Sequence, residues 1–389
     1  MTSTLLIAPL SSLSWAPAST VIWEGFIVVN LKGLAIFVPH PRELIAPVLL
    51  LVVFGLAIAM HPPSRDTLDY TLDLLRSMLK DGTARALLAT GAGLVLASAG
   101  VDLSVVGVAV MSGVLFALGV RLFELAPADI MLLACLITTC VLIGSGVGAF
   151  NGWTVARFKA PALIVTWGIG AIVLIIAVGL AELMPRISSL SGLMNADASG
   201  IPIANELADL TSDSKLLALL ASALFIGIPI FLSAFNIGRN ARAVGAHRIS
   251  AMYAGIRVRK TLLATYAASG AFAAGAGVWL ALLEGKAMTA SYAGLELSAI
   301  AIAVLGGTAM SGGYFSPVPI VCAAYFWSVM LSLLQGPDVP TGSLNTTLQA
   351  KAAEALFALA LILVSIALGR RLSGDTVTIN IHSRIGGKA

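Results

Sequence analysis

Uninterrupted apolar stretches are the feature that most constrains this chain. Nine intervals lack Asp, Glu, Lys and Arg, and most of them approach the 20 or so apolar residues that a membrane-crossing helix requires. The interval 297–337 is long enough for two crossings, so the sequence predicts about ten transmembrane helices. The other eight intervals are 44–64, 86–101, 103–120, 130–156, 160–181, 216–238, 261–283 and 355–369.

Composition supports lipid as the surrounding solvent. The chain is 58% apolar and 11% charged, whereas a soluble domain carries about 25% charged residues. Transmembrane strands would alternate in polarity over about ten residues, and these intervals are longer and continuous. We therefore expect an all-α polytopic membrane bundle. The net charge of only +4 and the short basic clusters argue against nucleic acid as a partner.

Basic loops set the orientation. The loop 239–260 carries six basic residues and no acid, the turn 157–159 carries two, and the tail begins with Arg370 and Arg371. The loop 182–215 is acidic. Ten crossings with both termini in the cytoplasm place every basic loop inside. The expected domains are an N-terminal cytoplasmic or interfacial segment (1–43), a transmembrane permease domain (44–370) and a cytoplasmic tail (371–389). Within the first, Glu24 and Lys32 favour an interfacial helix over 21–38, although an eleventh crossing stays open.

Enzyme chemistry finds no support. The chain has no G-x-x-x-x-G-K-[ST] phosphate loop and no H-E-x-x-H metal motif, so we expect no catalytic residue, no cofactor and no metal site. The glycine-rich segment 144–148 lies inside an apolar stretch and favours close helix packing. Transport, channel and scaffold roles remain.

Three polar or glycine-rich segments interrupt the apolar pattern. Asp102, in Gly100-Val101-Asp102-Leu103-Ser104, either caps the following helix or contacts a substrate or ion. The basic loop holds a segment, 246–253, that can form a small surface helix binding a partner's acids or lipid phosphates, or it is a plain positive-inside loop. The glycine pairs at 306–307 and 312–313 indicate either an interrupted helix or a tight cytoplasmic turn.

Together, these segments resemble the permease subunits of bacterial ATP-binding-cassette (ABC) importers for monosaccharides, of the ribose and galactose type, within the branched-chain-type permease superfamily. Gly100 to Ser104 is similar to the family's Gly-Ile-Asp-Leu-Ser, and Ala243 to Ile256 to its Ala-x-Gly and Gly-Ile loop. Glu296 to Gly313 is similar to its Glu-Leu-x-Ala-Ile-Ala followed by two Gly-Gly pairs. Asn151-Gly152 and the stretch 161–166 extend the likeness, which runs from about residue 44 to 370.

The resemblance implies inverted repeats, a multi-pass location in the bacterial inner membrane and a permease dimer of identical or related chains. It also implies ABC ATPase subunits, a periplasmic sugar-binding protein and alternating access. The expected ATPase-coupling residues are Arg242, Gly245, Arg248, Ala251, Gly255 and Ile256. The expected translocation-pathway residues are Asp102, Ser104, Asn151, Thr166, Gly306, Gly307, Ser311, Gly312 and Gly313.

The substrate expected is a polar, uncharged monosaccharide, because the apolar stretches contain no cluster of Arg or Lys that could bind a phosphate and no ring of acidic residues that could bind a cation. Trp153 and Trp167 offer aromatic faces for a sugar, or they belong to an interfacial belt. A permease of the same type for a nucleoside or a furanosyl signalling molecule is the alternative. An ion-coupled secondary transporter and a membrane scaffold are weaker alternatives.

Overall fold

The computed structural model describes most of the helical part of the chain. The described residues are 21–23, 26–31, 34–39, 41–59, 67–126, 128–183, 201–203, 222–223, 226–227, 229–230, 236–287 and 294–335. Several expectations fall mainly or wholly outside them: residues 1–20, the acidic loop 182–215, the crossings at 216–238 and 355–369, and the tail 371–389.

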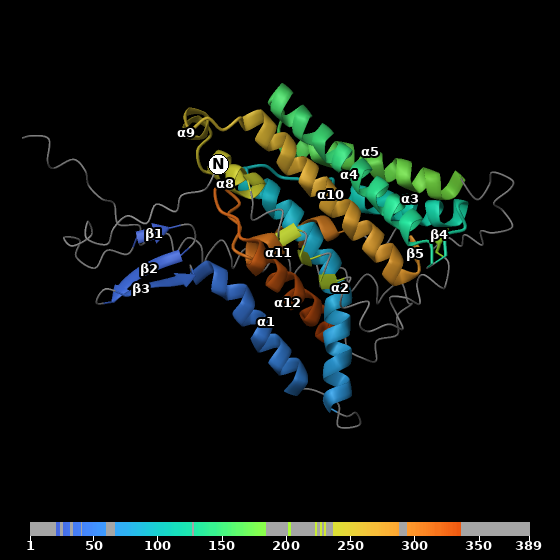
Figure 1. Ribbon diagram of the computed structural model, residues 1–389, viewed down its shortest axis with the longest axis horizontal. Coiled ribbons are helices and arrows are strands. Elements are labelled where there is room, and N and C mark those ends of the chain that lie inside the picture. The colour runs from blue at the N-terminus through green and yellow to red at the C-terminus, as the bar shows by residue number, and fades with distance from the viewer. Residues whose placement is uncertain are drawn as a thin grey trace, which may run out of the picture.

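The described part is a bundle of helices, as the apolar intervals predict (Figure 1). Four of the described helices are long and apolar enough to cross a membrane. They are α3 (Val105–Leu122), α4 (Ile130–Phe158) and α5 (Ala162–Leu183), which follow one another in the chain, and α10 (Val258–Glu284). The other helices are α1 (Pro41–Ala59), α2 (Thr67–Ala97), α8 (Asn236–Ala246), α9 (Arg248–Tyr253), α11 (Leu295–Leu305) and α12 (Pro317–Gln335). The helical membrane bundle is thereby confirmed, while the count of ten, the inverted repeats, the cytoplasmic termini and the domain bounds stay predictions.

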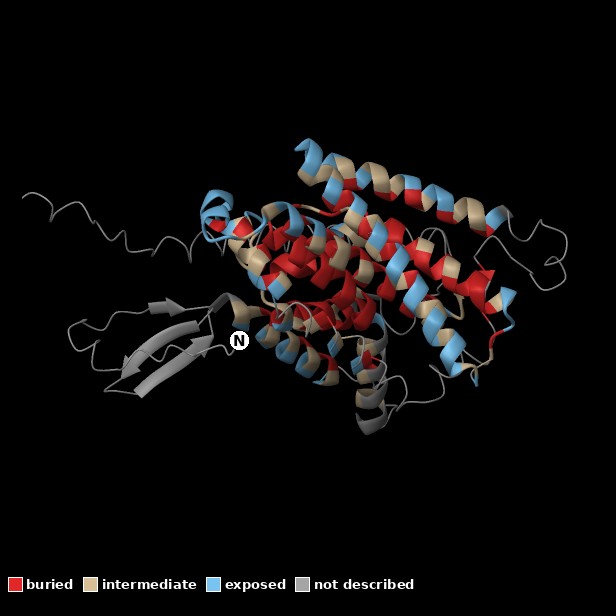
Figure 2. Cartoon of the chain, turned by 45° about the horizontal axis from the view of Figure 1, so that its top comes forward, coloured by how far each residue is buried: buried red, intermediate tan, exposed pale blue. Residues whose placement is uncertain are grey.

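Two hydrophobic cores share the long helix α2. One core joins α2 with α3, α10 and parts of α4, α5 and α11, and the other joins α2 with α1, α12 and the rest of α11. In the apolar window of α3, 78% of the residues are buried, against 11% in α4 and 22% in α5. Figure 2 accordingly shows buried residues in the middle of the bundle and exposed residues on its outer helices. Because α4 and α5 are apolar on their exposed faces too, those faces suit lipid rather than water.

Glycines bring α4 and α10 into close contact. A Cβ on Gly148 would lie 2.0 Å from the Tyr266 carbonyl oxygen, and one on Gly144 would lie 2.7 Å from the Gly270 carbonyl oxygen. Gly146, between them in sequence, would meet nothing within 4 Å. Small residues four positions apart let two helix backbones approach in lipid, where burial of apolar surface drives little association. The packing interpretation of the segment 144–148 is confirmed.

The basic segments gather at one end of the bundle, which we call the basic end. The turn between α4 and α5 lies there with α9 and the start of α10, because Lys159, Arg248 and Arg259 line one cavity. The turn between α11 and α12 also reaches this end, since Gly313 packs against Ala246 of α8. At the opposite end, β4 (Ile201–Pro202) pairs with β5 (Lys286–Ala287), which follows α10. The basic loop 239–260 and the turn 157–159 thus share one end, as the positive-inside rule predicts, although Arg121 at the end of α3 and Lys286 of β5 lie toward the other end.

The expectation of an interfacial helix over 21–38 is wrong. This segment forms a three-stranded antiparallel sheet of β1 (Val21–Trp23), β2 (Phe26–Leu31) and β3 (Leu34–Pro39). Trp23 pairs with Phe26 and Leu31 with Leu34, so each pair is separated by two residues, the second of them glycine. Two-residue connections ending in glycine are typical of hairpins, and the many Val and Ile residues favour strands.

Candidate functional site

A break between α2 and α3 carries the buried carboxylate that the sequence singles out. Residues 98–104 leave the helical path, and Ala99 has a positive φ of 59°. The Ser104 N–H and hydroxyl both donate to Asp102 Oδ1, at 3.0 and 2.6 Å. The Ser269 hydroxyl of α10 donates to Asp102 Oδ2 at 2.8 Å. Asp102 therefore accepts three hydrogen bonds, one of them from the backbone just before α3. It does not cap the helix itself, because its backbone partner is the N-cap residue Ser104, whose side chain makes no capping bond.

Two further helices attach to the same break. Asn151 of α4 donates through Nδ2 to Ser104 Oγ at 2.7 Å. Thr166 of α5 accepts from the Leu103 N–H at 3.0 Å and donates to the Ala162 carbonyl at 3.0 Å. Four of the five predicted polar pathway residues thus meet in one place, although up to 64 positions separate them in sequence (102 to 166). The fifth, Ser311, lies in the turn between α11 and α12. We call the four that meet, with Ser269, the Asp102 cluster.

The Asp102 cluster is closed to solvent in this conformation. Asp102 is 2% exposed, and the other members, Ser104, Asn151, Thr166 and Ser269, are each 0% exposed. A buried carboxylate is expensive unless donors surround it, and here three donors do. The cluster ties α2, α3, α4, α5 and α10 together at the basic end.

Sequence reasoning missed two residues of α10 that belong here. Ser269 binds Asp102 directly, and the Tyr266 hydroxyl donates to the Val101 carbonyl at 3.3 Å. The available signal was polar side chains three positions apart in an otherwise apolar helix, which places both on one face. That signal does not identify the partner, because the contact between Ser269 and Asp102 spans 167 positions.

The glycine segment 306–313 lies beside this break rather than within a membrane-depth cavity. It forms the irregular turn between α11 and α12, with positive φ at Gly307, Gly312 and Gly313. The Gly313 N–H donates to the carbonyl of Ala97, the last residue of α2, at 2.9 Å. The tight turn is therefore the alternative that the structure favours. Gly306 is buried, and Ser311 is exposed.

Gly245 closes this contact from the basic loop. A Cβ on Gly245 would lie 1.8 Å from the Ala97 carbonyl oxygen and 2.8 Å from the Gly313 nitrogen. Three backbones, from α8, from the end of α2 and from the turn 306–316, therefore meet without side chains between them. We call this contact the glycine junction. Its α2 residue, Ala97, lies five residues before Asp102 along the chain.

The predicted small surface helix is present as α9, and the motif residues explain its ends. His247 Nδ1 accepts from the Ser250 N–H at 3.2 Å at the start of the helix. At the other end Gly255, with φ +81°, donates to the Met252 carbonyl, and Ile256 donates to the Ala251 carbonyl, both at 3.0 Å. This pair of bonds is the Schellman motif, which requires a left-handed residue where Gly255 stands.

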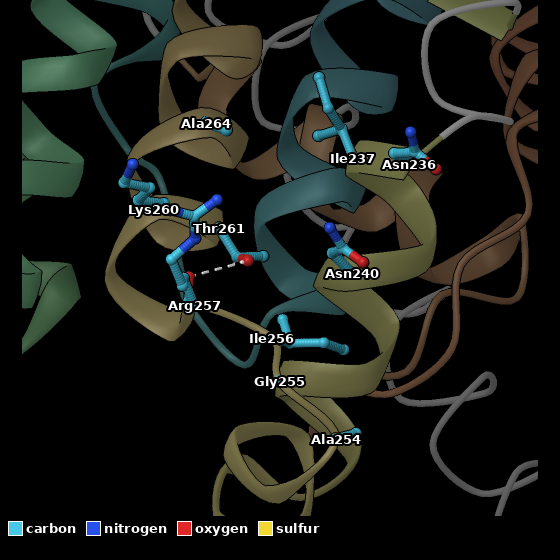
Figure 3. A pocket seen from close by; sticks show the side chains of 10 residues that line it. All are labelled: Asn236, Ile237, Asn240, Ala254, Gly255, Ile256, Arg257, Lys260, Thr261 and Ala264. Atoms are coloured by element: carbon cyan, nitrogen blue, oxygen red, sulfur yellow. Dashed lines mark hydrogen bonds between the residues drawn. The ribbon is translucent and has the colours of Figure 1, made fainter. Parts of the chain in front are cut away.

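A small cavity lies between α8 and the start of α10 (Figure 3). Asn236 and Asn240 face it from α8, Lys260 and Thr261 come from α10, and Arg257 directly precedes α10. Its volume is about 360 Å³. Of the predicted coupling residues, Gly255 and Ile256 line this cavity, Arg242 and Gly245 lie on α8, and Arg248 and Ala251 lie on α9.

These features define a class of protein: a multi-pass membrane permease with a basic end and no phosphate-binding loop in its sequence. The chain belongs to the family described as branched-chain amino acid transport system / permease component, whose profile matches residues 75–366. Members of this class are transport permeases, not enzymes.

Curated relatives narrow the comparison. The chain is 29% identical to the autoinducer 2 import system permease protein LsrC of Enterobacter sp. (strain 638), over 73% of this chain and 77% of the relative. It is 27% identical to the ribose import permease protein RbsC of Haemophilus influenzae, over 71% of this chain and 79% of the relative. No solved structure matches the chain. The resemblance to sugar ABC importer permeases is confirmed.

Proposed function

We propose that this chain is the transmembrane permease of an ABC importer that moves a monosaccharide, a pentose, hexose or furanose, across the bacterial inner membrane. The observation that carries the proposal is the match to import permeases for ribose and autoinducer 2 over more than 70% of the chain. A periplasmic binding protein delivers the sugar, and a separate ATPase supplies the energy. The absence of a phosphate-binding loop from the sequence fits this division of labour.

The ATPase docks on α9 and its flanking residues. Ile249 and Met252 are each 55% exposed and Tyr253 is 90% exposed, at helix positions i, i+3 and i+4. An exposed apolar face at the basic end supports a protein partner there. The coupling residues proposed from the family, Arg242, Gly245, Arg248, Ala251, Gly255 and Ile256, surround this helix.

Movement of α9 passes through the glycine junction to the break that carries Asp102. Alternating access requires two conformations of the permease. If the glycine junction packs differently in each, an ATP-bound partner that prefers one packing shifts the permease toward that conformation. Asp102, Ser104, Asn151, Thr166 and the turn 306–313 then move with the pathway that the permease forms with a second copy or a related chain.

The test is ATPase activity of the purified complex in lipid, with and without candidate binding proteins loaded from a panel of monosaccharides. Stimulation by one loaded protein is the expected result, and it identifies the substrate. If no ATPase co-purifies and no sugar stimulates hydrolysis, the proposal fails and proton-coupled uptake in vesicles tests the secondary-transporter alternative.

The second candidate is a permease of the same type for a nucleoside or a furanosyl signalling molecule. The similarity to permeases that import autoinducer 2 supports this second candidate. A panel extended with nucleosides and autoinducer 2 separates the two candidates in the same assay. A scaffold without a pathway predicts a captured partner and no uptake.

A further inference from the structure

A second cavity lies at the basic end, beside α9. It shares Arg248 and Met252 with the proposed ATPase contact, while its other lining residues belong neither to that contact nor to the proposed pathway residues. Its volume is about 520 Å³, within the range of about 300–1,000 Å³ that holds small organic ligands. Lys159, Arg248 and Arg259 line it, from the turn before α5, from α9 and from α10, and all three residues are exposed. No acidic side chain is among its lining residues. The cavity therefore suits an anion larger than a free phosphate.

The rest of the lining is apolar apart from the hydroxyl of Tyr266, which donates to the Val101 carbonyl. Val155 of α4, Met252 of α9, and Val258 and Leu262 of α10 supply side chains, while Ala99 and Gly100 form part of the wall. A ligand that fills this space presents both a negative charge and hydrocarbon. Acidic side chains of a partner protein bring little hydrocarbon with their charge, so an amphiphile fits better.

Two exposed tryptophans near the cavity indicate its depth in the membrane. Trp153 lies five residues before the end of α4, and Trp167 lies five residues after the start of α5, so each is roughly 7.5 Å from its helix end. Their side chains are 46% and 65% exposed, as expected for an interfacial belt and not for a sugar site within this chain. Val155 and Ala156 of the lining follow Trp153 toward the helix end, which places the cavity at headgroup depth.

We propose that this cavity binds the headgroup and glycerol of an anionic phospholipid. Lys159, Arg248 and Arg259 hold the phosphate, and the apolar lining contacts the glycerol and the first methylenes. Clustered basic side chains at a cytoplasmic membrane surface attract anionic lipid in this way. Asp102, two residues beyond Gly100, does not oppose the charge at the surface because it is buried and bonded to three donors.

Tryptophan quenching in vesicles tests the proposal on the full chain. The chain is reconstituted in phosphatidylcholine containing either brominated phosphatidylglycerol or brominated phosphatidylcholine. We expect stronger quenching by the brominated phosphatidylglycerol, reported by Trp153 and Trp167. Replacing both tryptophans by Phe should remove the difference.

Two triple variants with equal charge change provide the comparison. Lys159→Gln, Arg248→Gln and Arg259→Gln together should remove the phosphatidylglycerol preference, with each cation contributing about fivefold. The control carries Arg239→Gln, Arg257→Gln and Lys260→Gln, which are exposed residues of the same loop outside the cavity lining, and it should keep the preference.

Several results would overturn the inference. Equal quenching by both lipids, or equal loss in both triple variants, would mean that a diffuse positive field acts instead of a site. Competition by soluble glycerol 3-phosphate would identify a free phosphate ester as the ligand. Loss of the preference once the ATPase is bound would assign the cavity to acidic side chains of that partner. None of these outcomes bears on whether a loaded sugar-binding protein stimulates hydrolysis.

Discussion

Replacement of Gly245 by Ala tests the glycine junction directly. The new Cβ would lie 1.8 Å from the Ala97 carbonyl oxygen, whereas carbon and carbonyl oxygen normally stay about 3.3–3.6 Å apart. The end of α8 must therefore move by about 1.5 Å. The atoms nearest to it, the Ala97 carbonyl oxygen and the Gly313 nitrogen, both belong to the backbone, so no side-chain rotation relieves the contact.

The free-energy change follows from two effects. Overpacking of this kind costs about 1–3 kcal/mol. The new Cβ would also lie 2.8 Å from the Gly313 nitrogen and so crowd both atoms of the hydrogen bond from the Gly313 N–H to the Ala97 carbonyl, now 2.9 Å apart. Loss of a buried hydrogen bond costs about 1–3 kcal/mol. We expect a total destabilisation of about 2–6 kcal/mol, measured as a lower thermal unfolding midpoint of the purified chain.

Coupling provides the functional measurement. A junction that transmits movement should hold about 1–3 kcal/mol of coupling free energy, so stimulation of ATPase activity by the loaded binding protein should fall about 5- to 150-fold in the Gly245→Ala complex. Gly146→Ala is the matched control, because its Cβ meets nothing within 4 Å. If Gly245→Ala equals Gly146→Ala in both midpoint and stimulation, the close contact is absent and the reasoning fails.

Three further substitutions test the packing around the Asp102 cluster by thermal unfolding of the purified chain. Asp102→Ala removes the acceptor of three hydrogen bonds and should lower the free energy of unfolding by about 3 kcal/mol or more. Asp102→Asn keeps an acceptor oxygen and should lower it by about 1 kcal/mol. Equal unfolding midpoints of the two variants would contradict the cluster. Gly148→Ala places a Cβ 2.0 Å from a backbone oxygen and should lower the midpoint, while Gly146→Ala should leave it unchanged or raise it, and the reverse order would refute the α4–α10 contact. Thr166→Val leaves the Leu103 N–H without its acceptor and should cost about 1–3 kcal/mol, against little change for Thr154→Val, whose exposed hydroxyl bonds only its own helix; similar losses would rule out the interhelical role.

Local features of the sequence predicted most of the described helices. The length of a charge-free run depends only on neighbouring residues, so α3, α4, α5 and α10 appear where the runs predict them. The run 297–337 shows the limit of that argument. Its first half forms α11, whose 11 residues extend roughly 16 Å, about half of the hydrocarbon thickness of a membrane.

The segment 21–38 shows a different limit. Glu24 and Lys32 argued for a helix at the interface, but the segments on either side of them in the sequence form strands. The period of the apolar residues was not informative, because the sequences of β2 and β3 are apolar at nearly every position. Turn chemistry, in the form of glycine at 25 and 33, was the stronger local evidence.

Contacts between distant segments could not be predicted from the sequence at all. Sequence reasoning selected Asp102, Ser104, Asn151 and Thr166 one at a time, and only the packing of α4, α5 and α10 against the break brings them together. The same holds for Gly245 and Gly313. Both approach the backbone of Ala97, and this shared neighbour explains why glycine stands at position 245.

The position of the break gives the buried carboxylate a physical rationale. A charge at the bilayer centre is costly, and the cost falls toward the interface. Asp102 follows the end of α2 by five residues and precedes α3 by three, at the same end of the bundle as Lys159 and Arg248. Its three hydrogen bonds and its place near the basic end offset part of the cost of burying this side chain. An ion-coupled carrier would instead need carboxylates in series across the membrane, so the location of Asp102 favours a residue that holds helices together beside the coupling loop.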